Sequence, residues 1–126
     1  MNRIELIQLL KSLNLPKDEY YILGGGSLLL CGLRETTKDL DLCVSSELFI
    51  TLKDKYSLSE KDKNSCGFYK LTELIEVVPT PKENFKAQEV DGFLVESLET
   101  ILAYKKKRNL PKDQIDIQNI EKFLNK

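Results

Sequence analysis

Residues 23–42 read LGGGSLLLCGLRETTKDLDL, and this stretch decides the fold. Gly24-Gly25-Gly26 and Ser27 stand between a short apolar segment, residues 20–23, and an unbroken apolar run, residues 28–31. Glycines let the backbone approach a ligand closely, and the free N–H groups at a helix start suit an anion such as phosphate. We expect a strand, a glycine turn and a short buried helix capped by Ser27. A tight turn with a serine cap and no ligand explains the same residues.

The same stretch ends in the alternating segment Asp39-Leu40-Asp41-Leu42, which continues to Val44 and predicts a strand. Side chains two residues apart on a strand project from the same face, so Asp39 and Asp41 should point the same way. Two carboxylates so close resist ionisation unless a cation compensates, and hard oxygen ligands suit Mg²⁺. The alternative is a solvated strand face that carries ordinary surface aspartates.

Hydrophobic periodicity and turn signals outline the rest of the chain. Helices are expected over residues 2–14, 46–55, 98–107 and from 111 to about 124, and strands over 69–71 and 74–78. Asp91-Gly92 predicts a two-residue hairpin turn between strands at 87–90 and 93–95. Helices interleaved with strands and hairpins favour a mixed sheet covered by helices.

Length and composition limit the possible classes of protein. The 126 residues suffice for one domain, and a net charge of −1 gives no general attraction to nucleic acid or membranes. Nucleic-acid binding would therefore need a local basic patch. Three cysteines without close pairing and no histidine argue against a disulfide framework, a zinc site and a His-activated nucleophile. No apolar run is long enough to span a bilayer, so we expect a cytoplasmic protein.

Together, these residues resemble the nucleotidyltransferase superfamily that includes DNA polymerase β. That family carries Gly-Ser or Gly-Gly at a helix start and then Asp-x-Asp, and Gly26-Ser27 and Asp39-Leu40-Asp41 match it in order and interval. The whole stretch looks closest to minimal members related to toxin–antitoxin, abortive-infection and lincosamide- or aminoglycoside-modifying enzymes. The resemblance covers residues 20–120. It implies an α/β (α+β) nucleotidyltransferase fold, a small mixed sheet flanked by helices, in a single domain over residues 1–126.

The resemblance extends into the C-terminal half of the chain. The basic and acidic residues of this branch are matched in order by Lys105, Lys112-Asp113 and Asp116. The arginine that usually precedes the Lys-Asp pair is absent, and Arg108 is its candidate substitute. The family also places a third carboxylate on a neighbouring strand, usually an aspartate. Glu76 is the best candidate for it, and Glu73 at the strand's edge is the rival.

Several cations near the acids allow two interpretations each. Lys105 continues the apolar stripe of the helix at residues 98–107, and a buried cation needs a partner. That partner is either Asp113, in an ion pair, or the triphosphate of a nucleotide. Arg34 and Lys38 flank the acids and either bind phosphate or substrate, or are simply solvated.

The resemblance implies transfer of a nucleoside monophosphate from an NTP, such as ATP, to an unidentified acceptor hydroxyl on a small molecule, RNA or protein. It assigns Mg²⁺ or Mn²⁺ to Asp39, Asp41 and Glu76, which also form the catalytic group. The residues assigned to the nucleotide are Gly25, Gly26, Ser27, Lys38 and Lys105. Two alternatives keep the fold without efficient catalysis: a toxin–antitoxin type interaction protein and an NTP-binding regulator. The short chain also favours a protein partner or a homo-oligomer.

Overall fold

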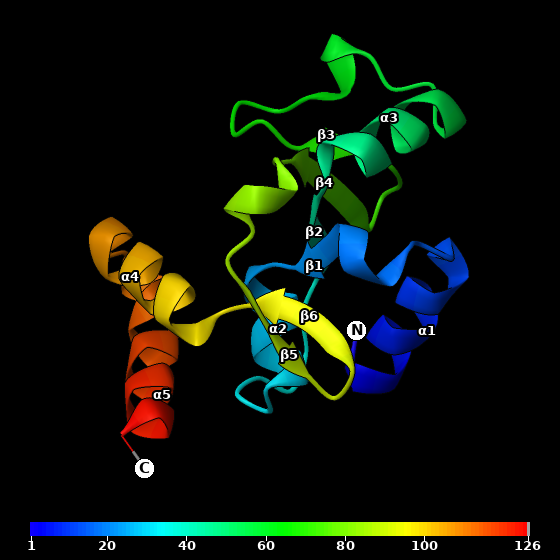
Figure 1. Cartoon of the computed structure of the whole chain (residues 1–126). Helices are drawn as coiled ribbons and strands as arrows, with labels where there is room; N and C mark the ends of the chain where they lie inside the picture. Colours follow the sequence, from blue (N-terminus) through cyan, green and yellow to red (C-terminus); the bar gives the residue numbers. More distant parts are fainter. Residues whose placement is uncertain (126) are drawn as a thin grey trace.

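The structure, a computed structural model, describes residues 1–125 (Figure 1). Within them the helices are α1 Arg3–Leu13, α2 Gly24–Leu30, α3 Ser46–Lys55, α4 Leu98–Arg108 and α5 Gln114–Leu124. The strands are β1 Tyr20–Ile22, β2 Leu40–Val44, β3 Tyr69–Lys70, β4 Ile75–Pro79, β5 Ala87–Val90 and β6 Phe93–Glu96. The expected mixed α/β architecture is confirmed.

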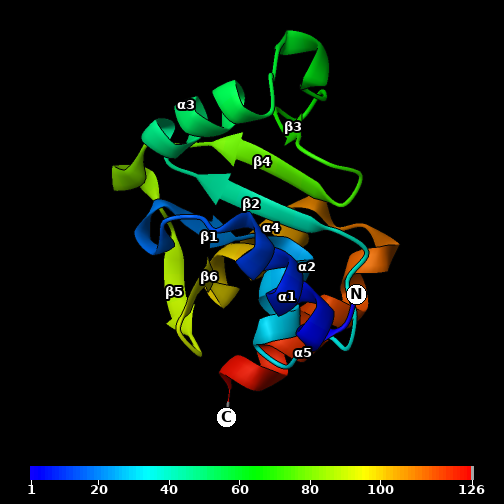
Figure 2. The ribbon, with the colours of Figure 1, turned by 90° about the vertical axis from the view of Figure 1, so that its right-hand side faces the viewer.

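In residues 1–125, six strands form one mixed sheet in the order β3-β4-β2-β1-β6-β5 (Figure 2). β2 lies at its centre, parallel to β4 on one side and antiparallel to β1 on the other. β1 in turn is parallel to β6, and β6 forms an antiparallel hairpin with β5. The hairpin turn is Asp91-Gly92, where both residues have positive φ, as expected.

One face of the central strands forms the main core. Leu40, Leu42 and Val44 alternate along β2 with Asp41 and Cys43, and all three are fully buried. They pack in one cluster with apolar residues of α1, α2 and α3, among them Leu6, Leu29 and Leu48. Because neighbouring side chains of a strand point to opposite faces, Asp41 is directed away from this core.

A second, smaller core joins the C-terminal helices to α2. It consists of Leu28 of α2, Leu98 and Ile101 of α4, and Ile120 of α5. Figure 1 shows α4 and α5 at the left of the molecule, with α5 below α4. Residues of α4 and Asp41 line the same cavity, so α4 lies beside the face of the sheet that carries Asp41.

Two helix starts differ from the expectation by more than one residue. The short helix begins at Gly24 rather than Leu28, and its N-cap is Leu23, so the prediction that Ser27 caps it was wrong. The cause is distant in sequence, because the side chain of Glu96 accepts a hydrogen bond from the Gly24 N–H and stabilises the earlier start. The last helix was expected from residue 111, but a 3₁₀ turn at Pro111–Asp113 precedes α5.

Among residues 1–125, none of the helices combines the length and the apolar character needed to cross a membrane.

The second core should control the attachment of α4 and α5. Ile120→Ala removes a side chain that is fully buried, so the free energy of unfolding in urea should fall by about 2–5 kcal/mol. Ile115→Ala is the matched control on the same helix, since Ile115 is 71% exposed and its loss should change that energy by no more than about 0.5 kcal/mol. Equal effects of the two changes would contradict this packing.

Candidate active site

Asp39 and Asp41 lie at the start of the central strand, where the sequence places them. Asp41 is the second residue of β2 and is half-buried, whereas Asp39 precedes the strand by one residue and is exposed. The two carboxylates are close enough for the charge of Asp39 to raise the pKa of Asp41. The two acids are therefore close to each other at the start of β2, although Asp39 lies outside the strand in which it was expected.

Glu76 lies beside Asp41 on the neighbouring strand. In the parallel pairing of β2 with β4, Asp41 is directly opposite Glu76, and Lys70 of β3 pairs with Glu76 on its other side. Paired residues of adjacent strands face the same side of a sheet, so both acids share a face, and like charges placed this way destabilise the sheet. Glu73, the rival candidate, lies before β4 and is not paired with β2. It forms an exposed ion pair with Lys70 at 3.2 Å.

Asp41 is in an unfavourable electrostatic environment. Burial, and then the charges of Asp39 and Glu76, raise the pKa of its carboxyl to about 6. Its Oδ1 is buried, and no atom of residues 1–125 forms a hydrogen bond with it. A buried polar atom without a partner is costly and calls for an explanation. A bound cation would supply both the missing partner and the missing positive charge.

The acids fit Mg²⁺ or Mn²⁺ as a pair of ligands rather than as a closed cage. Among residues 1–125, no three acidic, cysteine or histidine side chains are grouped so that they could hold a metal ion by themselves. Mg²⁺ commonly takes only one or two carboxylates from a protein and completes its shell with phosphate oxygens and water. Asp39 and Asp41 match that donor set, and Glu76 stands next to it.

The glycine turn is less available to a ligand than the sequence suggested. Ser27 is fully buried and its Oγ donates a hydrogen bond of 2.7 Å to the backbone oxygen of Glu96. Gly26 is also buried, and a Cβ there would come within 2.6 Å of Ile22 Cγ2, so its glycine is required for helix–strand packing. Of the three residues of this turn expected to contact phosphate, Gly25 lines the two cavities described below, whereas Gly26 and Ser27 line neither of them.

Glu96 is the residue that sequence reasoning missed. Its Oε1 accepts a hydrogen bond of 3.0 Å from the N–H of Gly24, the residue before the Gly25-Gly26-Ser27 turn that was expected to contact phosphate. Burial raises the pKa of this carboxyl, and the Gly24 N–H and the charge of Lys105 act in the opposite direction. The only signal in the sequence was an acid directly after the apolar residues 93–95.

Lys105 takes part in an ion-pair cluster between α4, α5 and the loop before β2. Its Nζ lies 3.4 Å from Asp113 Oδ1 and 3.3 Å from Asp116 Oδ2. Arg108 binds Asp113 through both its Nε, at 2.9 Å, and its terminal nitrogen. Arg34 donates a hydrogen bond of 2.5 Å from a terminal nitrogen to Asp116 Oδ2. The hydrogen bonds from Arg108 hold the pKa of the Asp113 carboxyl well below its usual range. The expected Lys105–Asp113 pair is present.

Two cavities, each of about 570 Å³, meet at this cluster. Gly25, Lys105 and Arg108 line both of them. Asp39 and Lys38 line the first cavity, and Asp41 and Glu96 line the second. Lys38 is exposed, and within residues 1–125 it forms none of the ion pairs. The two acids of the pair are therefore accessible from different hollows.

Comparisons with known proteins give limited information. No protein-family model matches the chain, and no curated protein matches it. A similar solved structure is that of a "putative nucleotidyltransferase" from Thermotoga maritima, which is 16% identical and matches with a TM-score of 0.44. The match covers 99% of this chain and 96% of that chain. A likeness at this level carries no weight for activity, so the function has to be inferred from the residues of the site.

Asp41 should destabilise the protein at neutral pH when no metal is bound. Its pKa is about 6 in the folded state and about 3.8 in the unfolded chain, so the folded state loses stability as the pH rises from about 4 through 6. Asp41→Asn should therefore raise the free energy of unfolding at pH 7.5 by about 1–2 kcal/mol, a value reduced for partial exposure, and by less at pH 4.5.

Urea unfolding of both proteins at the two pH values measures this difference. Asp39→Asn is the control, because Asp39 is exposed and its neutralisation should have a smaller effect. An Asp41→Asn protein that is no more stable than the original at pH 7.5 would show that the Asp41 charge is compensated within the chain.

Proposed function

We propose that this protein is a metal-dependent nucleotidyltransferase that transfers a nucleoside monophosphate from an NTP to an acceptor hydroxyl. The observation that carries the proposal is the buried, unpartnered Oδ1 of Asp41, which Asp39 and Glu76 surround with further negative charge. Folding alone gains nothing from this arrangement, whereas a divalent cation would neutralise it. The Gly-Ser and Asp-x-Asp pattern supports the same reading.

In this proposal, Asp39 and Asp41 are the protein ligands of Mg²⁺ or Mn²⁺. When bound, the metal would supply the charge that stabilises a nucleotide's phosphates during transfer. The exposed Asp39 and the half-buried Asp41 leave the remaining ligand positions to phosphate oxygens and water. The two acids would thus bind the cation weakly when no nucleotide is present. The cation and the nucleotide would bind tightly only together.

Glu76 is proposed as the general base. The acceptor oxygen would form a bond to the α-phosphorus of the NTP while the bond to the β-phosphate oxygen breaks, and pyrophosphate leaves. The proton of the acceptor hydroxyl would pass to the Glu76 carboxylate. Glutamate reaches one bond further than the aspartate that is usual here, so Glu76 can reach beyond the Asp41 carboxylate from the adjacent strand. The alternative role, as a third metal ligand, involves the same side chain.

The phosphates would be held by cations rather than mainly by the glycine turn. Lys105 lines both cavities, and Asp113 and Asp116 hold its Nζ in place. Lys38 and Gly25 lie on the cavity that contains Asp39. Positioned cations of this kind supply much of the rate in phosphoryl transfer, because they neutralise charge without reorganising.

The proposal does not specify the acceptor, which could be a small molecule, RNA or protein. It is compatible with a cytoplasmic location and with a protein partner or a homo-oligomer. An NTP-binding regulator is the second candidate, because the Ser27 hydroxyl, expected to hold a phosphate during transfer, donates its hydrogen bond to Glu96 instead. A toxin–antitoxin type interaction protein has no specific structural observation in its favour.

The proposed activity can be tested with α-³²P-labelled NTPs, Mg²⁺ or Mn²⁺, and total RNA, cell protein and the protein itself as acceptors. Label should enter an acceptor only with metal, and Asp41→Ala should reduce transfer by about a hundredfold or more, since even outer-shell partners of a metal contribute tenfold to a hundredfold. NTP binding without pyrophosphate release would favour the regulator. An Asp41→Ala protein with full transfer would exclude the proposed site.

Glu76 and Glu73 provide a matched pair of variants. Glu76→Gln should lower kcat by at least about a hundredfold with little change in the KM for NTP, because the base is lost while the phosphates remain bound. Glu73→Gln should leave both constants unchanged, because Glu73 is exposed at the strand's edge. If the Glu73 change were the more harmful one, the assignment of the third carboxylate would be reversed.

A further inference from the structure

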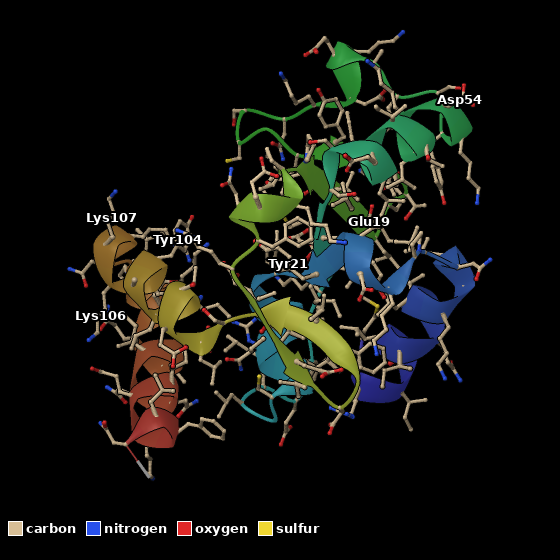
Figure 3. The ribbon with its side chains drawn as sticks, viewed as in Figure 1. Glu19, Tyr21, Asp54, Tyr104, Lys106 and Lys107 are labelled. Atoms are coloured by element: carbon tan, nitrogen blue, oxygen red, sulfur yellow. The ribbon has the colours of Figure 1, made fainter. Side chains whose placement is uncertain are left out.

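We infer that Tyr104 is a stacking surface for the base of the bound nucleotide, an inference that rests on the proposed function and identifies where the nucleoside lies. Tyr104 is 58% exposed, so its ring is accessible to a ligand. It lines the same cavity as Asp41, the residue proposed to hold the metal and phosphates. Figure 3 shows Tyr104 on α4, with Lys106 and Lys107 on other sides of the helix.

The ring of Tyr104 is held in place by its neighbours. The guanidinium carbon of Arg108 lies 5.0 Å from the ring centroid, and the Arg108 terminal nitrogen also donates a hydrogen bond of 3.4 Å to the tyrosine hydroxyl. Arg108 is itself fixed through its hydrogen bonds to Asp113, whose side chain is only 1% exposed. A ring held this way loses little freedom when a ligand stacks on it, so binding is favoured.

The chemistry of the cavity fits a nucleobase. Its volume of about 570 Å³ is in the range of small-molecule sites, and Phe68 and Ile101 add apolar surface to its wall. Aromatic rings and arginine planes are the groups on which proteins stack bases, and such stacking accepts every base because each has a π face. The wall of the cavity combines these apolar and aromatic side chains with the charged groups of Asp41 and Lys105. A nucleotide combines the complementary groups, a flat base and charged phosphates.

Stacking predicts a specific pattern of affinities. Replacing an aromatic side chain that stacks on a base typically weakens binding by about fivefold to a hundredfold. Tyr104→Ala should therefore weaken MgATP by this factor and leave Mg-tripolyphosphate, which has no base, unchanged. Tyr104→Phe should bind MgATP like the original protein. Lys107→Ala is the control on the same helix, since Lys107 is exposed and does not line the cavity.

Isothermal titration with MgATP and Mg-tripolyphosphate on the four proteins separates the outcomes. Loss of ATP affinity alone in Tyr104→Ala, with rescue in Tyr104→Phe, supports the inference. Equal weakening of both ligands, or no weakening of either, would overturn it and leave the proposed function standing. If the unmodified protein bound neither ligand, both the inference and the proposed function would fail. Because Tyr104 is exposed, the Tyr104→Ala protein should keep its melting temperature, which circular dichroism checks.

Discussion

The parallel pairing of β2 with β4 is the constraint on which the candidate site depends. It sets Asp41 opposite Glu76 on one face of the sheet, while Leu40 and Leu42 are buried on the other. Hydrophobic burial of these leucines fixes the register, because a slip by one residue would turn them to the opposite face. The free energy gained by burying the core thus holds the carboxylates of Asp41 and Glu76 side by side against their repulsion. Stability and the candidate site are consequently coupled through one strand.

Three cations near these acids lie on other elements and are already engaged in ion pairs. Lys105 and Arg108 of α4 are paired with Asp113 and Asp116, and Arg34 binds Asp116 from the loop before β2. These pairs tie the C-terminal helices to that loop around the wall of both cavities. The cations are therefore positioned at the edge of the site but do not reach Oδ1 of Asp41. The sheet therefore carries a local excess of negative charge, and the paired cations of α4 and the loop before β2 lie beside it.

Much of the fold could be predicted from local patterns. The spacing of Leu6, Leu10 and Leu13 indicates the inward face of α1, and Asp91-Gly92 identifies the hairpin, because both signals act within a few residues. The start of α2 could not be predicted, since it depends on Glu96, which lies 72 residues further along the chain. The hydrogen bond from the Ser27 hydroxyl to the backbone oxygen of Glu96 could not be predicted for the same reason. The orientation of Asp41 away from Leu40 and Leu42 could be predicted because alternation along a strand is a local property. Asp39 was expected in the same strand but lies one residue before it. The lack of a partner for Asp41 Oδ1 depends on the whole sheet and could not be predicted.

Glu96 also changes how a nucleotide could be bound. Its carboxylate already accepts the Gly24 N–H, and an NTP phosphate at that group would have to displace it and meet its negative charge. Phosphate contacts are therefore better supplied by Lys105 and Gly25, which lie where the two cavities meet. Under the proposed function, a cation shared by Asp39 and Asp41 would lie between the cavity with Tyr104 and the one with Lys38. The nucleoside would then occupy the Tyr104 side, and the phosphates would extend past Lys105 toward Lys38.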